Sequence, residues 1–134
     1  MEVKEDLFSN QITSVGFKSL LKTIKSHLVE LQLLELNISS NQIRIDNTFE
    51  EFFDFSNLSE LKNLDLNLGY NEINPEFLNV MFKNIATAHN IETLSINLES
   101  TPINPIHFGR AAKELYSLQK VKDLTLNISS SPMR

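Results

Sequence analysis

The segment Leu61-x-x-Leu64-x-Leu66-x-Leu68 decides the fold of this chain, because its apolar pattern returns at a constant interval of thirty residues. Within each copy, apolar and polar residues alternate, which predicts a strand with one buried face. A single strand cannot bury that face alone, so a fixed period of this length predicts units that stack side by side. The other three copies have the same spacing and span residues 31–38, 91–98 and 121–128.

Helices are predicted between the strands, because the apolar residues that follow each strand recur at helical spacing. Asn74-Pro75 and Asn104-Pro105 lie one period apart; asparagine is a good N-cap, and proline in the first turn loses no hydrogen bond. Ser14 is the expected N-cap of the first helix, and Asn47-Thr48-Phe49-Glu50 matches a capping box at the start of the second. We therefore expect helices over residues 14–29, 47–58, 75–88 and 105–118.

A column of short polar side chains lies where each unit passes from strand to helix. A buried side-chain amide can bond both the carbonyl and the N–H groups of a backbone that turns away from a sheet, and a hydroxyl can do part of the same work. We interpret the column as a turn-forming ladder rather than as a functional site. Its members are Asn10, Asn41, Asn71, Thr101 and Ser131, followed two residues later by Ile12, Ile43, Ile73, Ile103 and Met133.

The units resemble leucine-rich repeats, whose motif runs Leu-x-x-Leu-x-Leu-x-x-Asn-x-Leu, and they are most similar to the helix-bearing, ribonuclease-inhibitor type. The first unit carries the resemblance, with Asn10-x-Ile12-x-x-x-Gly16-x-x-x-Leu20 ahead of Leu28-x-x-Leu31-x-x-Leu34-x-Leu36. The sequence departs from the family by one further alternating pair, which extends the strands to Ile38, Leu68, Leu98 and Ile128. This longer strand is similar to that of repeat proteins from ciliated protozoa.

The resemblance implies an α/β fold: a right-handed solenoid of about four 30-residue repeats, with a parallel sheet on the concave face and helices on the convex face. Residues 1–134 would form one domain, and Val3, Glu5 and Leu7 could add an imperfect first strand. The repeats are expected near residues 10–40, 41–70, 71–100 and 101–134. The buried row expected to matter most for stability is Leu36, Leu66, Ile96 and Leu126.

Side chains alternate across a strand, so the residues between the leucines are expected on the open, concave surface. In the four repeated strands this surface is polar and slightly acidic, without a lysine or an aromatic ring. A file of asparagines runs through it, although asparagine is disfavoured in strands. Either the amides form a mutual ladder, or they offer hydrogen bonds to a partner. The candidate partner-binding residues are Glu35, Asn37, Asp65, Asn67, Ser95, Asn97, Glu99, Thr125 and Asn127.

Sequence features that would indicate catalysis or a cofactor are weak. Glu35 and Asp65 are expected about 5 Å apart, the separation of paired carboxylates in some hydrolases, but solvated acids on a shallow surface explain them better. His27, His89 and His107 fall in different repeats, and none has a second ligand at a metal spacing. The chain has no cysteine and no glycine-rich phosphate loop. We therefore expect no enzyme, no metal and no cofactor.

The composition narrows the expected partners and location. A formal net charge of -5 argues against a nucleic-acid partner, and no apolar run reaches membrane-spanning length. The lack of cysteine suits a reducing compartment, and the charged N-terminus does not match a secretory signal. We expect a cytoplasmic protein that binds protein rather than nucleic acid or membrane. The ciliate resemblance adds a ciliary or cytoskeletal location as an extrapolation.

The sequence stops at Ser131-Pro132-Met133-Arg134, directly after the last predicted strand, which would therefore present a free backbone edge. Exposed edges recruit other chains, so we expect either that the chain is a piece of a longer repeat protein or that a partner or a second copy covers the edge. Pro132 would limit how far pairing runs. The expected function is a non-catalytic protein–protein interaction module, a small structural subunit of a larger assembly. It would bind through its concave strand face and through its C-terminal edge, where self-association or an assembly neighbour is expected. The alternative is a recognition arm or inhibitor-type regulator in a signalling pathway.

Overall fold

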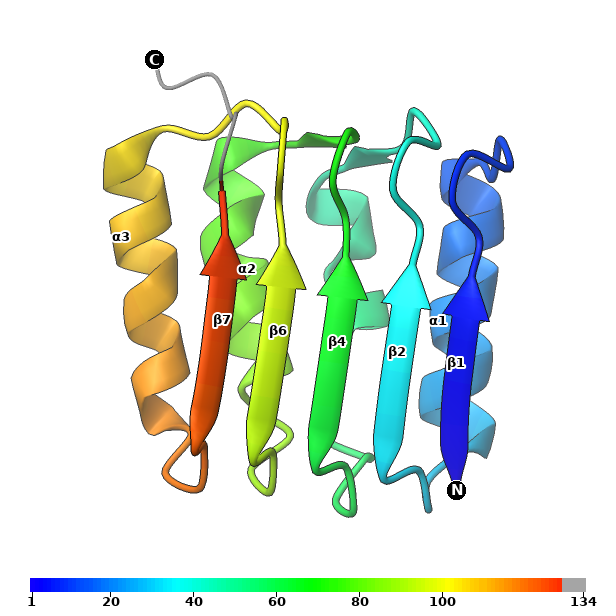
Figure 1. Cartoon of the computed structure of the whole chain (residues 1–134), viewed down its shortest axis with the longest axis vertical. Helices are drawn as coiled ribbons and strands as arrows, with labels where there is room; N and C mark the ends of the chain where they lie inside the picture. The colour runs from blue at the N-terminus through cyan, green and yellow to red at the C-terminus, as the bar shows by residue number, and fades with distance from the viewer. Residues whose placement is uncertain (129–134) are drawn as a thin grey trace.

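The computed structural model describes residues 1–128, and this part of the chain is a mixed α/β structure with three α-helices and a five-stranded sheet (Figure 1). The strands of this sheet lie side by side in the order β1-β2-β4-β6-β7. Their bounds are Glu2–Asp6 for β1, Leu33–Asn37 for β2, Asn63–Asn67 for β4, Thr93–Asn97 for β6 and Asp123–Asn127 for β7.

The four pairings in this sheet are all parallel, and their register follows the period of the sequence. Leu34 pairs with Leu64, Leu64 with Leu94, and Leu94 with Leu124. The predicted parallel strands are thus confirmed. The imperfect first strand is confirmed too, because Val3 of β1 pairs with Leu34 in the same row.

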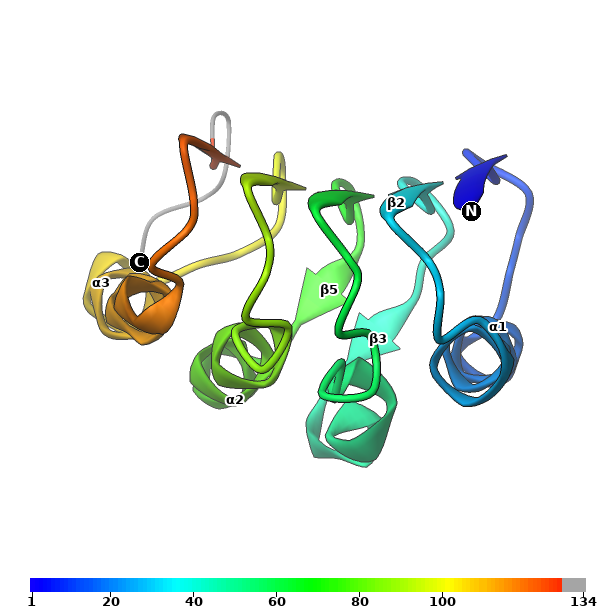
Figure 2. The ribbon, with the colours of Figure 1, turned by 90° about the horizontal axis from the view of Figure 1, so that it is seen from below.

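The helices lie on one face of the sheet and leave the other face open, as the end-on view shows (Figure 2). Helix α1 spans Ser14–His27 and α2 spans Pro75–Ile85. Helix α3 spans Pro105–Glu114 and is followed by the 3-10 helix η3 at Leu115–Ser117. Three of the predicted α-helices are therefore present. Each ends before its predicted last residue, which was 29 for α1, 88 for α2 and 118 for α3.

The two Asn-Pro helix starts are confirmed by their geometry. The side-chain oxygen of Asn74 accepts hydrogen bonds from the N–H of Glu76 at 2.9 Å and of Phe77 at 3.4 Å. The oxygen of Asn104 accepts from the N–H of Ile106 at 2.7 Å. Each asparagine satisfies backbone donors that have no partner inside the helix, so α2 and α3 begin at fixed positions.

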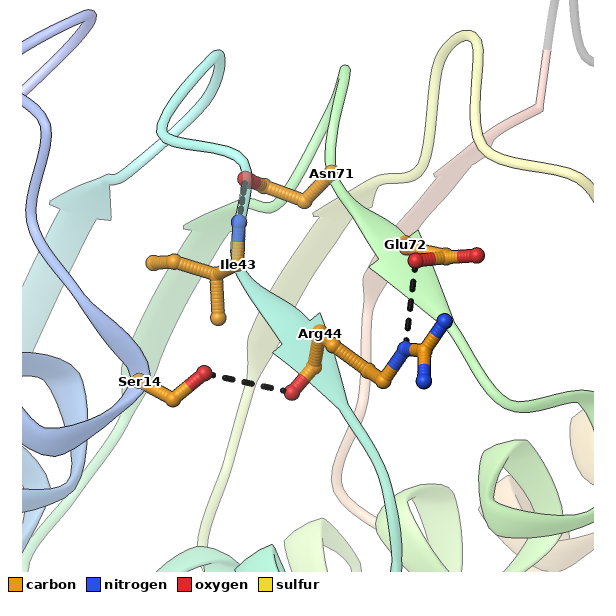
Figure 3. Close-up of polar contacts among 5 residues, drawn as sticks. All are labelled: Ser14, Ile43, Arg44, Asn71 and Glu72. Atoms are coloured by element: carbon orange, nitrogen blue, oxygen red, sulfur yellow. Dashed lines mark hydrogen bonds and ion pairs between the residues drawn. The ribbon is translucent and has the colours of Figure 1, made fainter.

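The sequence predicted Ser14 as the N-cap of helix α1, but the structure shows that Thr13 caps this helix. The hydroxyl of Thr13 accepts a hydrogen bond of 3.2 Å from the N–H of Gly16. The hydroxyl of Ser14 instead donates to the carbonyl of Arg44 at 3.4 Å, one unit further along the chain (Figure 3). Ser14 is therefore the first residue of α1 but not its cap, and its side chain links neighbouring units.

The α-helix predicted over residues 47–58 is wrong. Two short 3-10 helices stand in its place, η1 at Asn47–Phe49 and η2 at Glu51–Phe53. The expected capping box at Asn47 is wrong as well, because the carboxylate of Asp46 caps η1 by accepting from the N–H of Thr48 at 3.0 Å.

The physical reason is a longer connection before this segment. Asp46 lies five residues after Asn41 of the polar column, whereas Asn74 lies three residues after Asn71. Because the thirty-residue period is kept, two extra residues in the connection leave two fewer for the helical segment. The shortened segment closes as 3-10 turns instead of an α-helix.

The longer connection contributes one strand to a second, two-stranded sheet, and the next connection contributes the other. Its strands are β3 (Arg44–Ile45) and β5 (Glu72–Ile73), which pair in parallel. The N–H of Glu72 donates to the carbonyl of Ile43 at 2.9 Å. Pro102 holds the place of Glu72 in the next unit, and it has no N–H to donate, which explains why the small sheet does not continue there.

An aromatic cluster fills the core where the second α-helix is missing. Phe49, Phe53 and Phe55 come from this segment, and all three are fully buried. Phe49 contacts Phe17 of α1 with ring centroids 5.5 Å apart, and Phe53 contacts Phe77 of α2 at 6.2 Å. Such ring pairs are worth about 0.5–1.5 kcal/mol each beyond their burial. The cluster therefore joins α1 and α2 across the short 3-10 segment.

The central apolar row lies in the core as predicted, except at its end. Leu36 is 2% exposed, and Leu66 and Ile96 are fully buried. Leu126, on the last strand, is partly buried. The predicted apolar row is thus buried under the helices on β2, β4 and β6, and it becomes partly exposed on β7.

Candidate functional site

The polar column contains two buried amides at the end of the sheet, Asn41 and Asn71, the second of which is drawn in Figure 3. The oxygen of Asn71 accepts from the N–H of Asn41 at 3.1 Å and from the N–H of Ile43 at 3.0 Å. Its nitrogen donates to the carbonyl of Ile38 at 2.9 Å. Asn41 repeats the arrangement one unit earlier, where its oxygen accepts from the N–H of Ile12 at 2.8 Å. The predicted turn-forming ladder is confirmed at these two positions.

The other members of the column take smaller roles. Thr101 is buried, and its hydroxyl donates to the carbonyl of Leu98 at 2.6 Å, within its own turn. Asn10 is exposed, and its backbone N–H donates to the side chain of Asn41 at 3.0 Å. Ser131 and Met133 lie outside the described residues. The column is therefore part of the scaffold that holds the ends of the strands.

The open face consists of the outward-facing residues of the five strands, which line up in rows across the sheet. Eight of the nine predicted partner-binding residues fall in two adjacent rows, which confirms that the fold brings them together. The ninth, Glu99, follows the end of β6. The rows are Lys4, Glu35, Asp65, Ser95 and Thr125, and then Asp6, Asn37, Asn67, Asn97 and Asn127.

Sequence reasoning missed Lys4 and Asp6 in these two rows, and it missed the row before them, which consists of Glu2, Leu33, Asn63, Thr93 and Asp123. Strand β1 pairs with β2, so Lys4 stands beside Glu35 and Asp6 beside Asn37. The prediction that the open face has no lysine is correct for the four repeated strands. It is wrong for the whole sheet, because β1 adds Lys4. The alternation through Val3 was the signal that could have placed both residues on this face.

The asparagine file forms turns rather than a mutual ladder. In Asn37, Asn67 and Asn97 the amide oxygen accepts a hydrogen bond from the N–H two residues further along the chain, at the point where the strand ends. This local acceptor explains why asparagine recurs at a position that strands normally disfavour. The amide nitrogens are then the part of the file that a partner could meet. The distances are 3.1 Å from Asn37 to Ser39, 3.1 Å from Asn67 to Gly69 and 2.8 Å from Asn97 to Glu99.

Glu35 and Asp65 are cross-strand neighbours, as the sequence predicted. The side chain of Asp65 is exposed, yet partial desolvation by the surrounding sheet raises the pKa of its carboxyl, and the charge of Glu35 raises it further. Two hollows of about 300 and 170 Å³ both include this pair; one extends toward Lys4 and the other toward Asp123. The open face is therefore less flat than expected, and it holds an acid pair in which the ionised form of Asp65 is disfavoured.

The edge formed by β7 is apolar and open among the described residues. Leu124 is 51% exposed, whereas Leu94, its neighbour in the same row, is 2% exposed. Beside it lies a hollow of about 290 Å³, and Tyr116, which is 79% exposed, lines this hollow together with Leu94 and Leu124. The predicted limit on pairing by Pro132 concerns a residue outside the described range.

The opposite edge, formed by β1, is charged. Glu5 pairs in register with Leu36, so a carboxylate takes the place that an apolar side chain holds in the other strands. Glu5 is exposed, and Lys4 and Asp6 flank it in sequence. Inward-pointing charges of this kind block edge-to-edge pairing. The two edges of the sheet therefore differ, and the β7 edge is the one suited to a neighbour.

Residues 1–128 contain no group of three or more His, Asp, Glu or Cys side chains placed to hold a metal ion. None of the helices in the same range is long and apolar enough to cross a membrane. No protein-family model matches the chain, and no curated protein matches it either.

Proposed function

We propose that this chain is a non-catalytic protein–protein interaction module, and more specifically a small structural subunit of a larger protein assembly. The observation that carries the proposal is the exposure of Leu124, 51% against 2% for Leu94 in the same row. Burial of apolar surface contributes about 25 cal/mol per Å². A partner that covers this edge would gain stability from the kind of contact that joins one unit to the next.

The proposal includes a family. The chain would be a leucine-rich-repeat protein of the helix-bearing, ribonuclease-inhibitor-like type, built as a right-handed solenoid of about four repeats. Support comes from parallel strands paired at the thirty-residue period and from the buried amides of Asn41 and Asn71 at the asparagine position of the motif. Such a subunit would work in the cytoplasm, and a ciliary or cytoskeletal assembly is the home suggested by its repeat style.

Two surfaces would share the binding. An extended segment that pairs with β7 gains main-chain hydrogen bonds along the edge and places its apolar side chains beside Leu124. The polar rows of the open face would then select the partner, because unpaired polar or charged groups of a wrong partner would lose their water.

Self-association of the isolated chain tests the edge. A subunit without its neighbours should dimerise or aggregate through β7, and Leu124→Lys should keep it monomeric in multi-angle light scattering. Val29→Lys is the matched control, because Val29 is also half exposed (47%) and the charge change is the same. Equal behaviour of both variants would remove the β7 edge from the proposal.

The competing function is a recognition arm or inhibitor-type regulator, which the polar open face favours. A regulator of this kind should be a monomer alone and should bind its partner through the open face. Replacing Asn67 and Asn97 with lysine and capturing partners from the native source tests this, with circular dichroism to check folding. Loss of a partner by this double variant, but not by Leu124→Lys, would favour the regulator over the subunit.

A further inference from the structure

We infer that the open face binds a basic protein segment, with an arginine or lysine side chain seated between Glu35 and Asp65. The inference rests on the proposed function, because it specifies the partner of the same interaction module. Its basis is the charge of the face, the position of the acid pair and the kinds of hydrogen-bonding group beside that pair.

The charges of the chain are distributed unevenly between the two sides of the sheet. Within residues 1–128, the outward-facing positions of the five strands carry one base, Lys4. The lysines of α1 lie in the helix layer, where Lys18, for example, donates to the hydroxyl of Thr48 at 2.6 Å. The outward-facing acids are Glu2, Asp6, Glu35, Asp65 and Asp123.

None of these outward-facing acids forms an ion pair with a base of residues 1–128, although Lys4 is the cross-strand neighbour of Glu35. The ion pairs formed in residues 1–128 are Arg44–Glu72 at 3.3 Å (Figure 3) and Lys122–Glu92 at 3.7 Å, and neither includes an outward-facing acid of the five strands. The face therefore presents net negative charge to a partner. Charge complementarity speeds encounter and excludes partners of the same sign, so a basic segment is the favoured occupant.

Glu35 and Asp65 mark the centre of the proposed contact. They are paired in register on neighbouring parallel strands, which lie about 4.8 Å apart. Both line the hollow of about 300 Å³ and the hollow of about 170 Å³. A cation between them would interact with two carboxylates at once and would offset the charge of Glu35, which after desolvation is the second cause of the raised pKa of Asp65. The planar guanidinium of arginine suits such a bridging position.

The neighbouring row explains why a peptide suits this face better than a free cation. Asn37 and Asn67 line the same larger hollow as Glu35 and Asp65. Their oxygens are used in turns, and their amide nitrogens are donors. A peptide offers both a basic side chain for the acid row and carbonyl oxygens for the amide row. A bare metal ion offers nothing to the amide nitrogens, which also donate rather than accept.

Fluorescence anisotropy with a short labelled peptide of alternating arginine and serine tests the inference. The wild-type chain should bind it, should bind the glutamate–serine counterpart far more weakly, and should lose affinity as salt rises. The double variant Glu35→Gln, Asp65→Asn should weaken binding about tenfold. The matched control is Glu50→Gln, Glu51→Gln, which changes the net charge equally at exposed sites of the 3-10 segment and should weaken binding less than about twofold.

Several outcomes would overturn the inference. An equal loss of peptide affinity in both double variants would show attraction by net charge alone. No loss of affinity in either variant would show that Glu35 and Asp65 do not contact the peptide. Complete release of the peptide by millimolar Ca²⁺, with binding of the ion to the wild type but not to the first double variant, would assign the site to a metal. Circular dichroism and melting of each variant exclude unfolding as the cause. If the peptide does not bind while Leu124→Lys still abolishes self-association, the inference fails and the proposed function stands. If the peptide binds at the acid pair while Leu124→Lys leaves self-association unchanged, the β7 edge is not a contact surface and the basic partner remains supported.

Discussion

The side-chain oxygen of Asn71 accepts a hydrogen bond of 3.0 Å from the backbone N–H of Ile43, twenty-eight residues earlier in the chain (Figure 3). The same buried side chain accepts from the N–H of Asn41 and donates to the carbonyl of Ile38. One amide therefore satisfies backbone groups of two units at the point where the strands of the main sheet have ended. It takes over the role that ladder hydrogen bonds have inside the sheet.

Replacement of Asn71 by alanine should destabilise the fold strongly. Several buried backbone groups would lose their partner together, and each unsatisfied buried group costs about 1–3 kcal/mol. We expect a loss of at least about 3 kcal/mol in the free energy of unfolding, measured by urea denaturation. Asn10→Ala is the matched control, because Asn10 holds the same place in the first unit but is exposed. A loss of less than about 0.5 kcal/mol is expected there, and equal losses at both sites would contradict the role of the ladder.

Leu66→Asp should unfold the domain. Leu66 is fully buried in the central row, and the change removes about 1.5–3 kcal/mol of burial while placing a carboxylate in an apolar core. Domain stability is about 5–15 kcal/mol, so the cooperative melting transition should disappear or move far down in temperature. Leu124→Asp makes the same chemical change at a half-exposed site and should keep a native-like far-ultraviolet circular dichroism spectrum. A folded Leu66→Asp variant would show that the register is wrong.

The register of the main sheet could be predicted because two constraints in the sequence agree. A one-residue slip between β4 and β6 would turn every leucine to the open face, and the constant period fixes which residues pair, as Leu64 does with Leu94. The second helix could not be predicted in the same way, because its apolar spacing also fits 3-10 turns. The warning was Arg44, which stands where the later units have the N-caps Asn74 and Asn104.

The open face was predictable from alternation, but its detailed chemistry was not. Alternation assigns Asn97 to that face without saying whether its oxygen bonds a neighbouring strand or its own chain. The hydrogen bond from the N–H of Glu99 is local turn chemistry, which competes with contacts across the sheet. The first strand was difficult for another reason: Glu5 stands in register with Leu36, so the apolar pattern is broken at its centre.

Ser40→Gly should stabilise the protein. Ser40 has a φ of 60°, in the left-handed region that side chains with a Cβ atom disfavour. Relief of this strain exceeds the extra chain entropy that glycine loses on folding, so we expect a gain of about 0.5–1 kcal/mol. Ser19→Gly in the middle of α1 is the opposite case and should cost about 0.5 kcal/mol. Chemical denaturation of both variants measures the difference, and a loss at Ser40 would show that its backbone is not strained.

Asp65→Asn should alter the pH dependence of stability. The pKa of Asp65 is raised in the folded state above its ordinary value of 3.8, first by desolvation and then by Glu35. Between these two pKa values the folded state binds more protons than the unfolded state, so stability falls as pH rises through this window. At a pH above the raised pKa, the ionised Asp65 destabilises the folded wild type by its full amount. At a pH well below 3.8 the carboxyl is protonated in both states, and this destabilisation is absent. The variant should therefore gain stability over the wild type as pH rises, by about 0.5 kcal/mol near neutral pH, because solvent screens the exposed carboxylate.

Asp46 provides a control of opposite sign. Its pKa is lowered below 3.8, chiefly by the side-chain hydrogen bond from Thr48, so the stability it supplies is present above 3.8 and is lost as pH falls through the lowered pKa. Melting temperatures of wild type, Asp65→Asn and Asp46→Asn, taken from pH 2.5 to pH 7, would separate the two effects. The advantage of Asp65→Asn should appear as pH rises above about 3.8. A constant difference between Asp65→Asn and wild type across this range would mean that Asp65 ionises as it does in the unfolded chain, and that the sheet and Glu35 exert no net effect on it.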